Sequence, residues 1–283
     1  TFPTKVNYPV GDIFYSVAIG DINGDGISDL VVGCYNKISV LIGNGDGTFA
    51  TKVDYTGPQY SYSISIGDLN GDGKDDIATA NNSSKISVFL NSGNGILLPK
   101  VDYDAVGTTW STVMADFDKD GFNDLVTVNY TSSILSIFIN NGDGTFATRV
   151  DYPTPVGPRG LATGDLNYDG LMDLITGNYD GQNVSIFMGN GDGTFATRVD
   201  YPVNNNNIEE VEVGDLNGDG TVDLAVVNSL VKAVTVLLNL NQTTSMFFAD
   251  ASTGNIGIGT SSPYLPLSVS GDAMITGGLN VGI

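Results

Sequence analysis

The sequence feature that most constrains the fold is a nine-residue, aspartate-rich motif that occurs five times. The copies begin at Asp21, Asp68, Asp116, Asp165 and Asp215, so the intervals between them are 47, 48, 49 and 50 residues. Self-similarity with a period of about 20 to 50 residues is typical of repeat architectures, in which each repeat forms one supersecondary unit. The chain is therefore expected to be an array of five similar units.

Each unit contains four short apolar runs of strand length. In the first unit they are residues 16–19, 30–33, 38–42 and 52–55, and Gly, Asn and Asp separate them. β-branched and aromatic residues fill the runs, which is strand composition. A Gly-Asn-Gly-Asp-Gly-Thr-Phe turn, or a variant of it, joins the last two runs of the first four units. Repeated four-stranded antiparallel units of about 40 to 50 residues are typical of propeller blades. We therefore predict an all-β, five-bladed β-propeller over residues 1–240.

The two ends of the array suggest how the ring closes. Thr4-Lys-Val-Asn-Tyr8 resembles the fourth strand of a unit, whereas no such strand follows Asn239 in the fifth unit. The N-terminal strand is therefore expected to complete the last blade, which would remove two exposed sheet edges. The alternative is a larger ring, of which these five units are a part.

The motif Asp-x-Asn/Asp-x-Asp-Gly-x-x-Asp has the chemistry of a calcium loop. It places oxygen-bearing side chains at positions 1, 3, 5 and 9, a backbone carbonyl at 7, and a glycine at 6 that permits a sharp reversal. Calcium prefers such a flexible shell of oxygen ligands. An EF-hand would need Glu at position 12 and flanking helices, but position 12 is Val or Thr here. The alternative is that Asn-Gly-Asp-Gly is only favourable turn chemistry. Five copies favour calcium, about one ion per blade.

These motifs, with Ala-Ile-Gly before Asp21 and Leu-Val-Val-Gly after Asp29, resemble FG-GAP/VCBS repeats. Such repeats form the calcium-bearing propeller blades of integrin α-subunits and many bacterial surface proteins, and the likeness covers residues 1 to about 240. Integrin propellers have seven blades, so their partner-binding surfaces are not transferred to this chain. The calcium ligands that the resemblance implies are Asp21, Asn23, Asp25, Ile27, Asp29, Asp68, Asn70, Asp72, Lys74, Asp76, Asp116, Asp118, Asp120, Phe122, Asp124, Asp165, Asn167, Asp169, Leu171, Asp173, Asp215, Asn217, Asp219, Thr221 and Asp223, with the carbonyl oxygen acting at position 7.

The rim opposite the calcium loops is the expected binding surface. Its loops vary between units and are rich in aromatic and amide residues. A sugar ring needs an apolar face to stack on and polar groups nearby for its hydroxyls, and such a rim can supply both. The alternative is that these residues pack between blades or lie in exposed turns. The candidate ligand-binding residues are Tyr15, Tyr35, Tyr62, Trp110, Tyr130 and Tyr179.

Charge and composition exclude several classes of function. The 11 Lys and Arg residues stand against 32 Asp and Glu residues, and a net charge of −21 disfavours nucleic acid and anionic membranes as partners. No apolar run reaches the roughly 20 residues of a membrane-spanning helix. The chain has no histidine, the usual general acid or base near neutral pH, so an enzyme is not expected. An enzyme that used a pair of carboxylates would have to draw the pair from four candidates: Asp180, Glu209, Glu210 and Glu212.

Residues 241–283 form a Gly- and Ser-rich extension. The phrase at 254–263 and the segment 267–283 resemble stalk repeats that precede self-cleaving chaperone domains in phage tail fibres and large bacterial surface proteins. Its apolar residues lie in segments too short to enclose a core, so we expect homo-oligomer contacts through 241–283.

Together these features predict an extracellular or cell-surface, calcium-stabilised adhesion module. Its partner would be a glycan, bound in a lectin-like manner, or a surface protein. The alternative is a structural subunit of an extracellular fibre, sheath or tail-fibre-like assembly, whose partners are neighbouring subunits.

Overall fold

The computed structural model describes residues 5–203 except residue 12, residues 207–239, and the backbone of three short strands beyond them. Every regular element of this part of the chain is a β-strand, so the all-β prediction is confirmed. No helix with the length and apolar character of a membrane span occurs in the described residues.

Five antiparallel sheets correspond to the five sequence repeats. Blade 1 contains β1 (Phe14–Gly20), β2 (Asp29–Cys34), β3 (Lys37–Leu41) and β4 (Val53–Thr56). Blade 2 contains β5 (Ser61–Gly67), β6 (Asp76–Asn81), β7 (Lys85–Phe89) and β8 (Val101–Asp104). Blade 3 contains β9 (Thr109–Ala115), β10 (Asp124–Asn129), β11 (Ile134–Phe138) and β12 (Val150–Pro153). Blade 4 contains β13 (Pro158–Gly164), β14 (Asp173–Asn178), β15 (Asn183–Phe187) and β16 (Val199–Pro202). Blade 5 contains β17 (Ile208–Gly214), β18 (Asp223–Asn228) and β19 (Ala233–Leu237).

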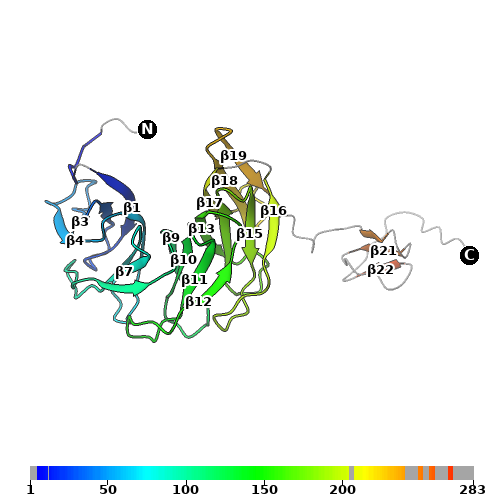
Figure 1. Ribbon diagram of the computed structural model, residues 1–283, viewed down its shortest axis with the longest axis horizontal. Helices are drawn as coiled ribbons and strands as arrows, with labels where there is room; N and C mark the ends of the chain where they lie inside the picture. Colours follow the sequence, from blue (N-terminus) through cyan, green and yellow to red (C-terminus); the bar gives the residue numbers. More distant parts are fainter. Residues whose placement is uncertain are drawn as a thin grey trace, which may run out of the picture.

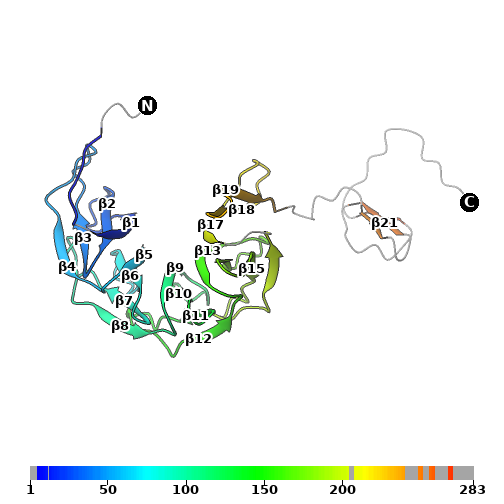
Figure 2. The same cartoon turned by 45° about the horizontal axis from the view of Figure 1, so that its top comes forward.

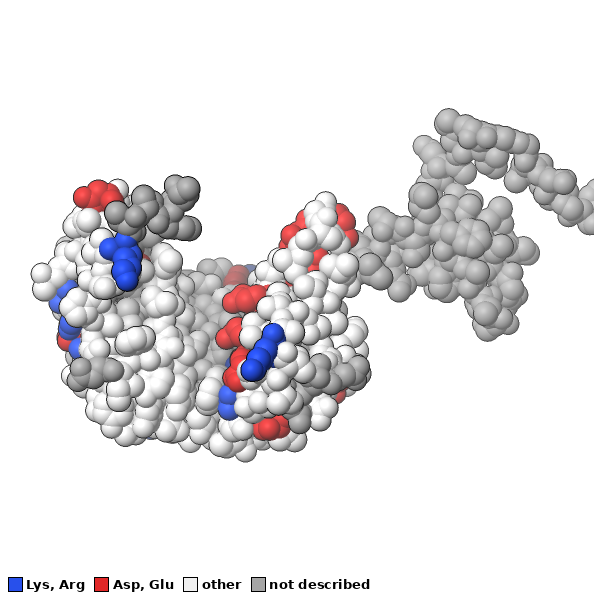
Figure 3. Space-filling view, turned by 90° about the horizontal axis from the view of Figure 1, so that it is seen from above, with Lys and Arg blue, Asp and Glu red and all other residues white. Residues whose placement is uncertain are grey.

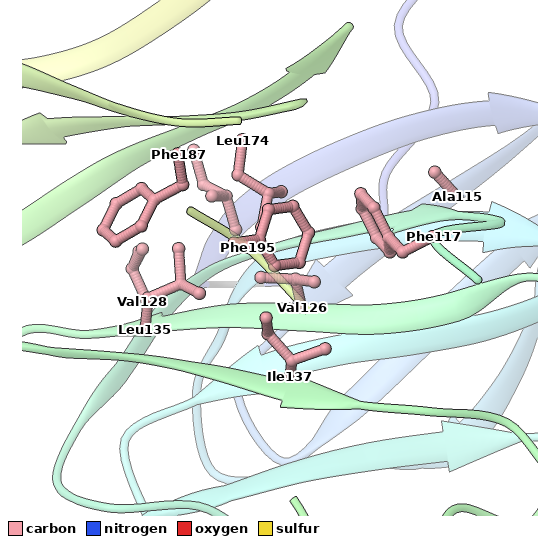
Figure 4. Packing of buried hydrophobic residues seen from close by; sticks show 10 residues of the cluster. Ala115, Phe117, Val126, Val128, Leu135, Ile137, Leu174, Phe187 and Phe195 are labelled. Atoms are coloured by element: carbon pink, nitrogen blue, oxygen red, sulfur yellow. The ribbon is translucent and has the colours of Figure 1, made fainter. Parts of the chain in front are cut away.

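The blades stand side by side in an arc, with their first strands on the inside (Figures 1 and 2). The first strands of neighbouring blades contact each other in the series β1, β5, β9, β13 and β17. The hydrophobic core is divided among the interfaces between blades. Figure 4 shows one such cluster, in which Val126 and Ile137 of blade 3 face Leu174 and Phe187 of blade 4. Each blade is therefore stabilised mainly by burial against its neighbours.

A fully buried aspartate at motif position 9 joins two loops in each blade. In blade 3, Asp124 Oδ2 accepts a hydrogen bond from the Phe117 backbone N–H at 3.0 Å, and Oδ1 accepts one from the Asn140 N–H at 2.8 Å. Phe117 begins the aspartate-rich loop and Asn140 begins the Gly-Asp-Gly turn. The equivalent residues Asp29, Asp76, Asp173 and Asp223 make the same pair of bonds.

The glycine at motif position 6 is required by the backbone of the loop. Its φ angle is positive in all five blades, between 77° at Gly73 and 93° at Gly121. This region is strained for residues with a Cβ atom, so the loop reverses without strain only where glycine stands. The sharp reversal expected from the sequence is confirmed.

The expected closure of the ring is not what the structure shows. Blade 5 has three strands in the described part of the chain, residues 5–11 pair with no strand, and the arc is open (Figure 2). Tyr8 instead packs edge-on against Phe49 of blade 1, with ring centroids 5.3 Å apart, and its hydroxyl accepts a 3.2 Å bond from the Phe49 N–H. Tyr152 of blade 3 makes the same two contacts with Phe195 of blade 4. The N-terminal segment thus takes the place of an outer strand that precedes blade 1.

Two glutamates provide the physical reason for the open ring. On the first strand of each blade, two alternate side chains face the next blade. In blades 1 to 4 they are the uncharged, mostly small residues Ser16 and Ala18, Ser63 and Ser65, Ser111 and Val113, and Gly160 and Ala162. In blade 5 they are Glu210 and Glu212. A closed five-bladed ring would press these carboxylates against Val17 and Ile19 of blade 1, and burying unpaired charges against aliphatic side chains is costly. The alternative, in which these five blades are part of a larger ring, stays a prediction.

Three further strands lie in the C-terminal extension. β20 (Phe248–Asp250) pairs antiparallel with β21 (Asn255–Ile258), which pairs parallel with β22 (Leu267–Val269). The remainder of 241–283 lies outside the described residues, so the division of the chain at residue 240 and the stalk role stay predictions.

The first prediction concerns the buried aspartate. Replacing Asp124 by Ala leaves two buried backbone N–H groups without an acceptor and should lower the free energy of unfolding by about 2–4 kcal/mol. Urea unfolding in the presence of a chelator measures this loss without any contribution from calcium. Asp143→Ala, which removes an exposed turn carboxylate in the same blade, should lower the free energy of unfolding far less. Equal losses in the two variants would contradict the role assigned to Asp124.

Candidate functional site: an aromatic rim, a central hollow and the opposite aspartate loops

A β-bulge near the start of the first strand in each blade directs one side chain onto the rim. The strand register skips one residue at this point in all five blades. β-bulges commonly re-aim a side chain next to a functional site. The five bulge residues are Tyr15, Tyr62, Trp110, Arg159 and Glu209, each six positions before the first aspartate of its motif.

The bulge residues contact one another in series from blade to blade. The ring centroids of Tyr15 and Tyr62 are 5.5 Å apart, and Tyr62 stacks on Trp110 at 4.7 Å with 21° between the planes. The Arg159 guanidinium carbon lies 4.2 Å from the centre of the Trp110 ring, and Arg159 Nη1 donates to Glu209 Oε2 at 2.7 Å. One equivalent position in five blades thus builds a continuous row of three aromatic rings, a cation and an anion.

Loop residues widen this row into an aromatic belt. At the blade 1 end, the ring centroid of Tyr60 lies 5.3 Å from that of Tyr15 and 5.4 Å from that of Tyr35. At the other end, Tyr130 lies 5.7 Å from Trp110 and 6.3 Å from Tyr179. All six rim residues expected from the sequence therefore belong to one surface, and Tyr60 is its seventh ring. Their ligand-binding role stays a prediction.

Arg159 is the functional residue that the sequence analysis missed. Its guanidinium carbon lies 3.5 Å from the centre of Tyr179, 4.9 Å from Tyr130 and 4.2 Å from Trp110. Such contacts are cation–π interactions, which contribute more when the cation is partly desolvated. The signal that reveals Arg159 is its fixed distance to the motif, because the residues at this distance in blades 1 to 3 are Tyr15, Tyr62 and Trp110.

The belt borders a cavity of about 620 Å³ between the first strands of the blades, here called the central hollow. Tyr15, Tyr62 and Trp110 line it together with serine and threonine hydroxyls, and Glu210 and Glu212 line it from blade 5. Figure 3 shows acidic side chains on the blade 5 side of the opening. Desolvation by the surrounding protein, and secondarily repulsion from Glu212 and Glu209, raises the pKa of Glu210 to about 7.

The aspartate loops lie on the opposite rim, as expected. In the first loop, both Asp21 carboxylate oxygens accept backbone N–H bonds from Gly24, Asp25 and Gly26. The position 5 carboxylate accepts the N–H of position 7 in all five loops. In three loops the position 3 amide also donates to this carboxylate, in the pairs Asn23 and Asp25, Asn167 and Asp169, and Asn217 and Asp219.

The third loop differs because aspartate replaces asparagine at position 3. Carboxylate oxygens of Asp116, Asp118 and Asp120 lie within 4.8 Å of one another, and Asp116 Oδ1 is buried with no hydrogen-bond partner. Burial, and secondarily the other two carboxylates, raises the pKa of Asp118. Burial also raises the pKa of Asp124, at position 9, to about 6. An orphaned oxygen among converging carboxylates fits a hard cation such as calcium.

Repeated radial sheets with an aspartate-rich loop in every blade define a repeat protein of the β-propeller class. The chain belongs to the FG-GAP-like repeat family, whose model matches residues 21–79, 68–127, 116–176 and 166–226. The resemblance drawn from the sequence motifs is thereby confirmed. The chain has no significant match among curated protein sequences.

Solved structures share the fold at low identity. The first is BBS1N in complex with ARL6DN, with a TM-score of 0.58 and 15% identity over 82% of this chain and 68% of that chain. The second is a putative 6-phosphogluconolactonase from Bacteroides uniformis, with a TM-score of 0.56 and 19% identity over 85% and 67% of the two chains. The third is an Agrocybe aegerita lectin that recognises non-reducing terminal N-acetylglucosamine, with a TM-score of 0.49 and 22% identity. It is matched over 66% of this chain, which spans about half (51%) of the lectin's length. The first two likenesses show the fold alone.

The second prediction concerns the pH dependence of stability. Because the folded-state pKa of Glu210 is raised, the folded protein holds a proton that the unfolded chain releases between about pH 4.5 and pH 7. This group therefore lowers stability as pH rises through that window and has no further effect above it. The unfolding free energy of Glu210→Gln, measured in urea, should fall less between about pH 5 and pH 8 than that of the wild type.

Asp192→Asn is the matched control. This exposed turn carboxylate has a lowered pKa because of its hydrogen bonds to Thr194, so it stays ionised across the same window. Its profile should follow the wild type, and a Glu210→Gln profile that also follows the wild type would show that the hollow does not desolvate this carboxylate.

Proposed function

We propose that the chain is a calcium-stabilised glycan-binding module that acts in adhesion or recognition at an extracellular surface. The observation that carries the proposal is the stacked row of Tyr15, Tyr62 and Trp110 beside the hydroxyl-lined central hollow. Tyr62 is stacked on both Tyr60 and Trp110, and Arg159 lies over the Trp110 ring. A sugar would therefore contact the sides of these rings that line the hollow, and hydroxyl and carboxylate groups can bond its hydroxyls. A volume of about 620 Å³ is within the range of small-ligand sites, about 300–1,000 Å³.

A purely structural role, in which the aromatic residues only fill space between blades, explains the belt less well than ligand binding does. Tyr15 and Tyr35 remain 38% and 39% exposed. The hydrophobic clusters between blades 1 to 4 consist mainly of aliphatic and phenylalanine side chains and contain neither residue, although Trp110 packs against the cluster between blades 3 and 4. Exposed aromatic residues that gather on one rim are therefore available to a ligand.

The alternative function, a structural subunit of a fibre or sheath, is favoured by the open ends of the arc. Val17 and Ile19 on blade 1 are 64% and 69% exposed, and Val234 on blade 5 is 62% exposed. Exposed apolar groups at uncovered repeat ends favour contact with another molecule. Homo-oligomerisation through 241–283 belongs to the same alternative. Filaments in electron micrographs of purified protein would support it.

A catalytic role is not proposed. Glu209 is bound to Arg159, and Asp180 accepts a 3.1 Å hydrogen bond from the Tyr130 hydroxyl, so the two rim carboxylates already have partners. The likeness to a putative 6-phosphogluconolactonase concerns the fold only. The absence of catalysis stays a prediction.

Calcium is proposed at the five aspartate loops because they share one ligand pattern, and in the third loop a bound cation would also offset the repulsion between three converging carboxylates. The side chains of positions 1, 3, 5 and 9 and the carbonyl of position 7 would hold each ion. Bound calcium would stabilise the folded chain by an amount that grows with the logarithm of the calcium concentration relative to the dissociation constant.

The third prediction uses the unusual third loop. Asp118→Asn removes one carboxylate from the repelling group and introduces the amide that bonds to position 5 in three other loops. In chelator, the variant should therefore melt at a higher temperature than the wild type, whereas in millimolar calcium this gain should vanish or reverse because a charged ligand is lost. Scanning calorimetry in both buffers measures the two differences. A difference of the same sign and size in both would contradict calcium at this loop.

The fourth prediction tests the aromatic belt. A glycan array in calcium buffer should give at least one bound glycan, and calorimetric titration of that glycan should show Tyr62→Ala and Trp110→Ala weakened about tenfold or more. Tyr201→Ala is the matched control, since this tyrosine is 44% exposed on the outer strand β16, away from the belt. Thermal melting checks that each variant is folded. Absence of any bound glycan, or unchanged affinity in folded Trp110→Ala, would refute the proposed function.

A further inference from the structure

The central hollow has two chemically different walls. Blades 1 to 3 supply the rings of Tyr15, Tyr62 and Trp110, and blade 5 supplies Glu210 and Glu212. Ser63 and Ser65 are among the hydroxyl residues of blade 2 that line the space between these walls. Within the described residues that line the hollow, the two glutamates are the only charged side chains, and no Lys or Arg stands among them.

The cation of the aromatic belt, Arg159, is already engaged. It is ion-paired with Glu209 at 2.7 Å and lies over three aromatic rings, so it does not neutralise Glu210 and Glu212. The raised pKa of Glu210 agrees with this geometry, because a facing cation would have lowered it. Glu210 Oε1 accepts a 3.3 Å bond from the Val211 N–H, but the described residues that line the hollow supply no positive charge to this carboxylate wall.

The aromatic belt already tolerates a positive charge. Arg159 lies 3.5 to 4.9 Å from the ring centres of Trp110, Tyr130 and Tyr179, of which Trp110 also lines the hollow. An anionic ligand would instead meet two carboxylates and a chain with a net charge of −21. A neutral ligand would leave the glutamates without a counter-charge.

Resting on the proposed function, we propose that the central hollow selects sugars that carry a free, protonated amine, with the sugar ring against the aromatic side chains that line the hollow and the ammonium group between Glu210 and Glu212. The ligand class is thus amino-sugar oligomers, as opposed to their N-acetylated or acidic counterparts. The two glutamates are the specificity-determining residues, and the aromatic rings provide affinity that both kinds of sugar share.

The test compares two probes that differ only in the amine. Tetramers of glucosamine and of N-acetylglucosamine are titrated calorimetrically in calcium buffer at about pH 7 and about 0.15 M salt. Long-range charge effects are screened at this salt concentration, and at this pH a bound ammonium group favours the ionised form of Glu210. The wild type should bind the amine tetramer about five- to tenfold more tightly than the acetylated one. In the double variant Glu210→Gln, Glu212→Gln this preference should disappear while binding of the acetylated tetramer is retained.

A charge-matched control separates the site from the overall acidity of the chain. Asp143→Asn, Asp192→Asn also removes two carboxylates, but from exposed turns on the opposite rim. It should keep the full preference. If it loses the preference to the same extent as the glutamate variant, the selectivity comes from net charge and the inference is wrong.

The remaining outcomes distinguish this inference from the proposed function. If both tetramers bind equally and Trp110→Ala weakens both, the inference fails and glycan binding stands. If neither tetramer binds but the array yields a neutral glycan, again only the inference fails. If no glycan binds at all, both fail. Melting curves of the glutamate variant establish that it is folded before its affinities are interpreted.

Discussion

The buried aspartate at motif position 9 is the interaction on which the rest of each blade depends. Its two oxygens hold the aspartate-rich loop and the Gly-Asp-Gly turn side by side, as Asp124 does for Phe117 and Asn140. The side chain of Asn140 then donates to the Leu69 carbonyl of blade 2 at 2.7 Å, so the same turn also joins one blade to the preceding one. Burying a carboxylate is costly, but an oxygen that accepts backbone N–H bonds recovers much of that cost, and a nearby calcium ion would recover more. The loop rim is therefore rigid and repeated, and its sequence can vary little without loss of stability.

The opposite rim is free of that constraint, and this is where the five blades differ. The β-bulge fixes the position of one side chain per blade but not its chemistry, so the same site holds tyrosine, tryptophan, arginine and glutamate in turn. A scaffold that fixes position and leaves chemistry open is the usual way in which a repeat fold acquires a binding surface. The belt is itself held in place by contacts among its members, chiefly Arg159, which links the rings of blades 3 and 4 to Glu209 of blade 5. Removing a ring therefore also loosens its neighbours.

The sequence predicted the repeated elements well because each is specified locally. Strand-length runs of β-branched residues, glycines at positive φ and a period near 48 residues specify the blades, their order and the side on which each loop lies.

The six aromatic residues were predicted because they stand in the loops of the rim opposite the aspartate motifs. Arg159 was not, since its role depends on the blade-to-blade contact at the bulge, which no single unit displays. Ring closure was predicted incorrectly for a similar reason: Thr4 to Tyr8 has the sequence of an outer strand, but whether two end blades can meet depends on the facing residues Glu210, Glu212, Val17 and Ile19. The sequence predicted Asp124 only as a calcium ligand. Its second role, as the acceptor of two backbone hydrogen bonds, became apparent only from the fold.

The open arc and the chemistry of the hollow have a common origin in Glu210 and Glu212. At the equivalent positions of the other blades, small side chains such as Gly160 and Ala162 let the next first strand pack closely, and Gly160 has room for no Cβ beside Glu210 and Val211. Glutamates at these positions prevent such close packing of blade 5 on a further blade, so less apolar surface is buried there. In return the carboxylates remain at the edge of the hollow, where a ligand can meet them. A fully closed five-bladed ring would have to neutralise or expel both charges, whereas the open arc keeps them available opposite the aromatic wall. The two glutamates that oppose closure of a five-bladed ring thus also form the charged wall of the hollow, opposite the aromatic wall.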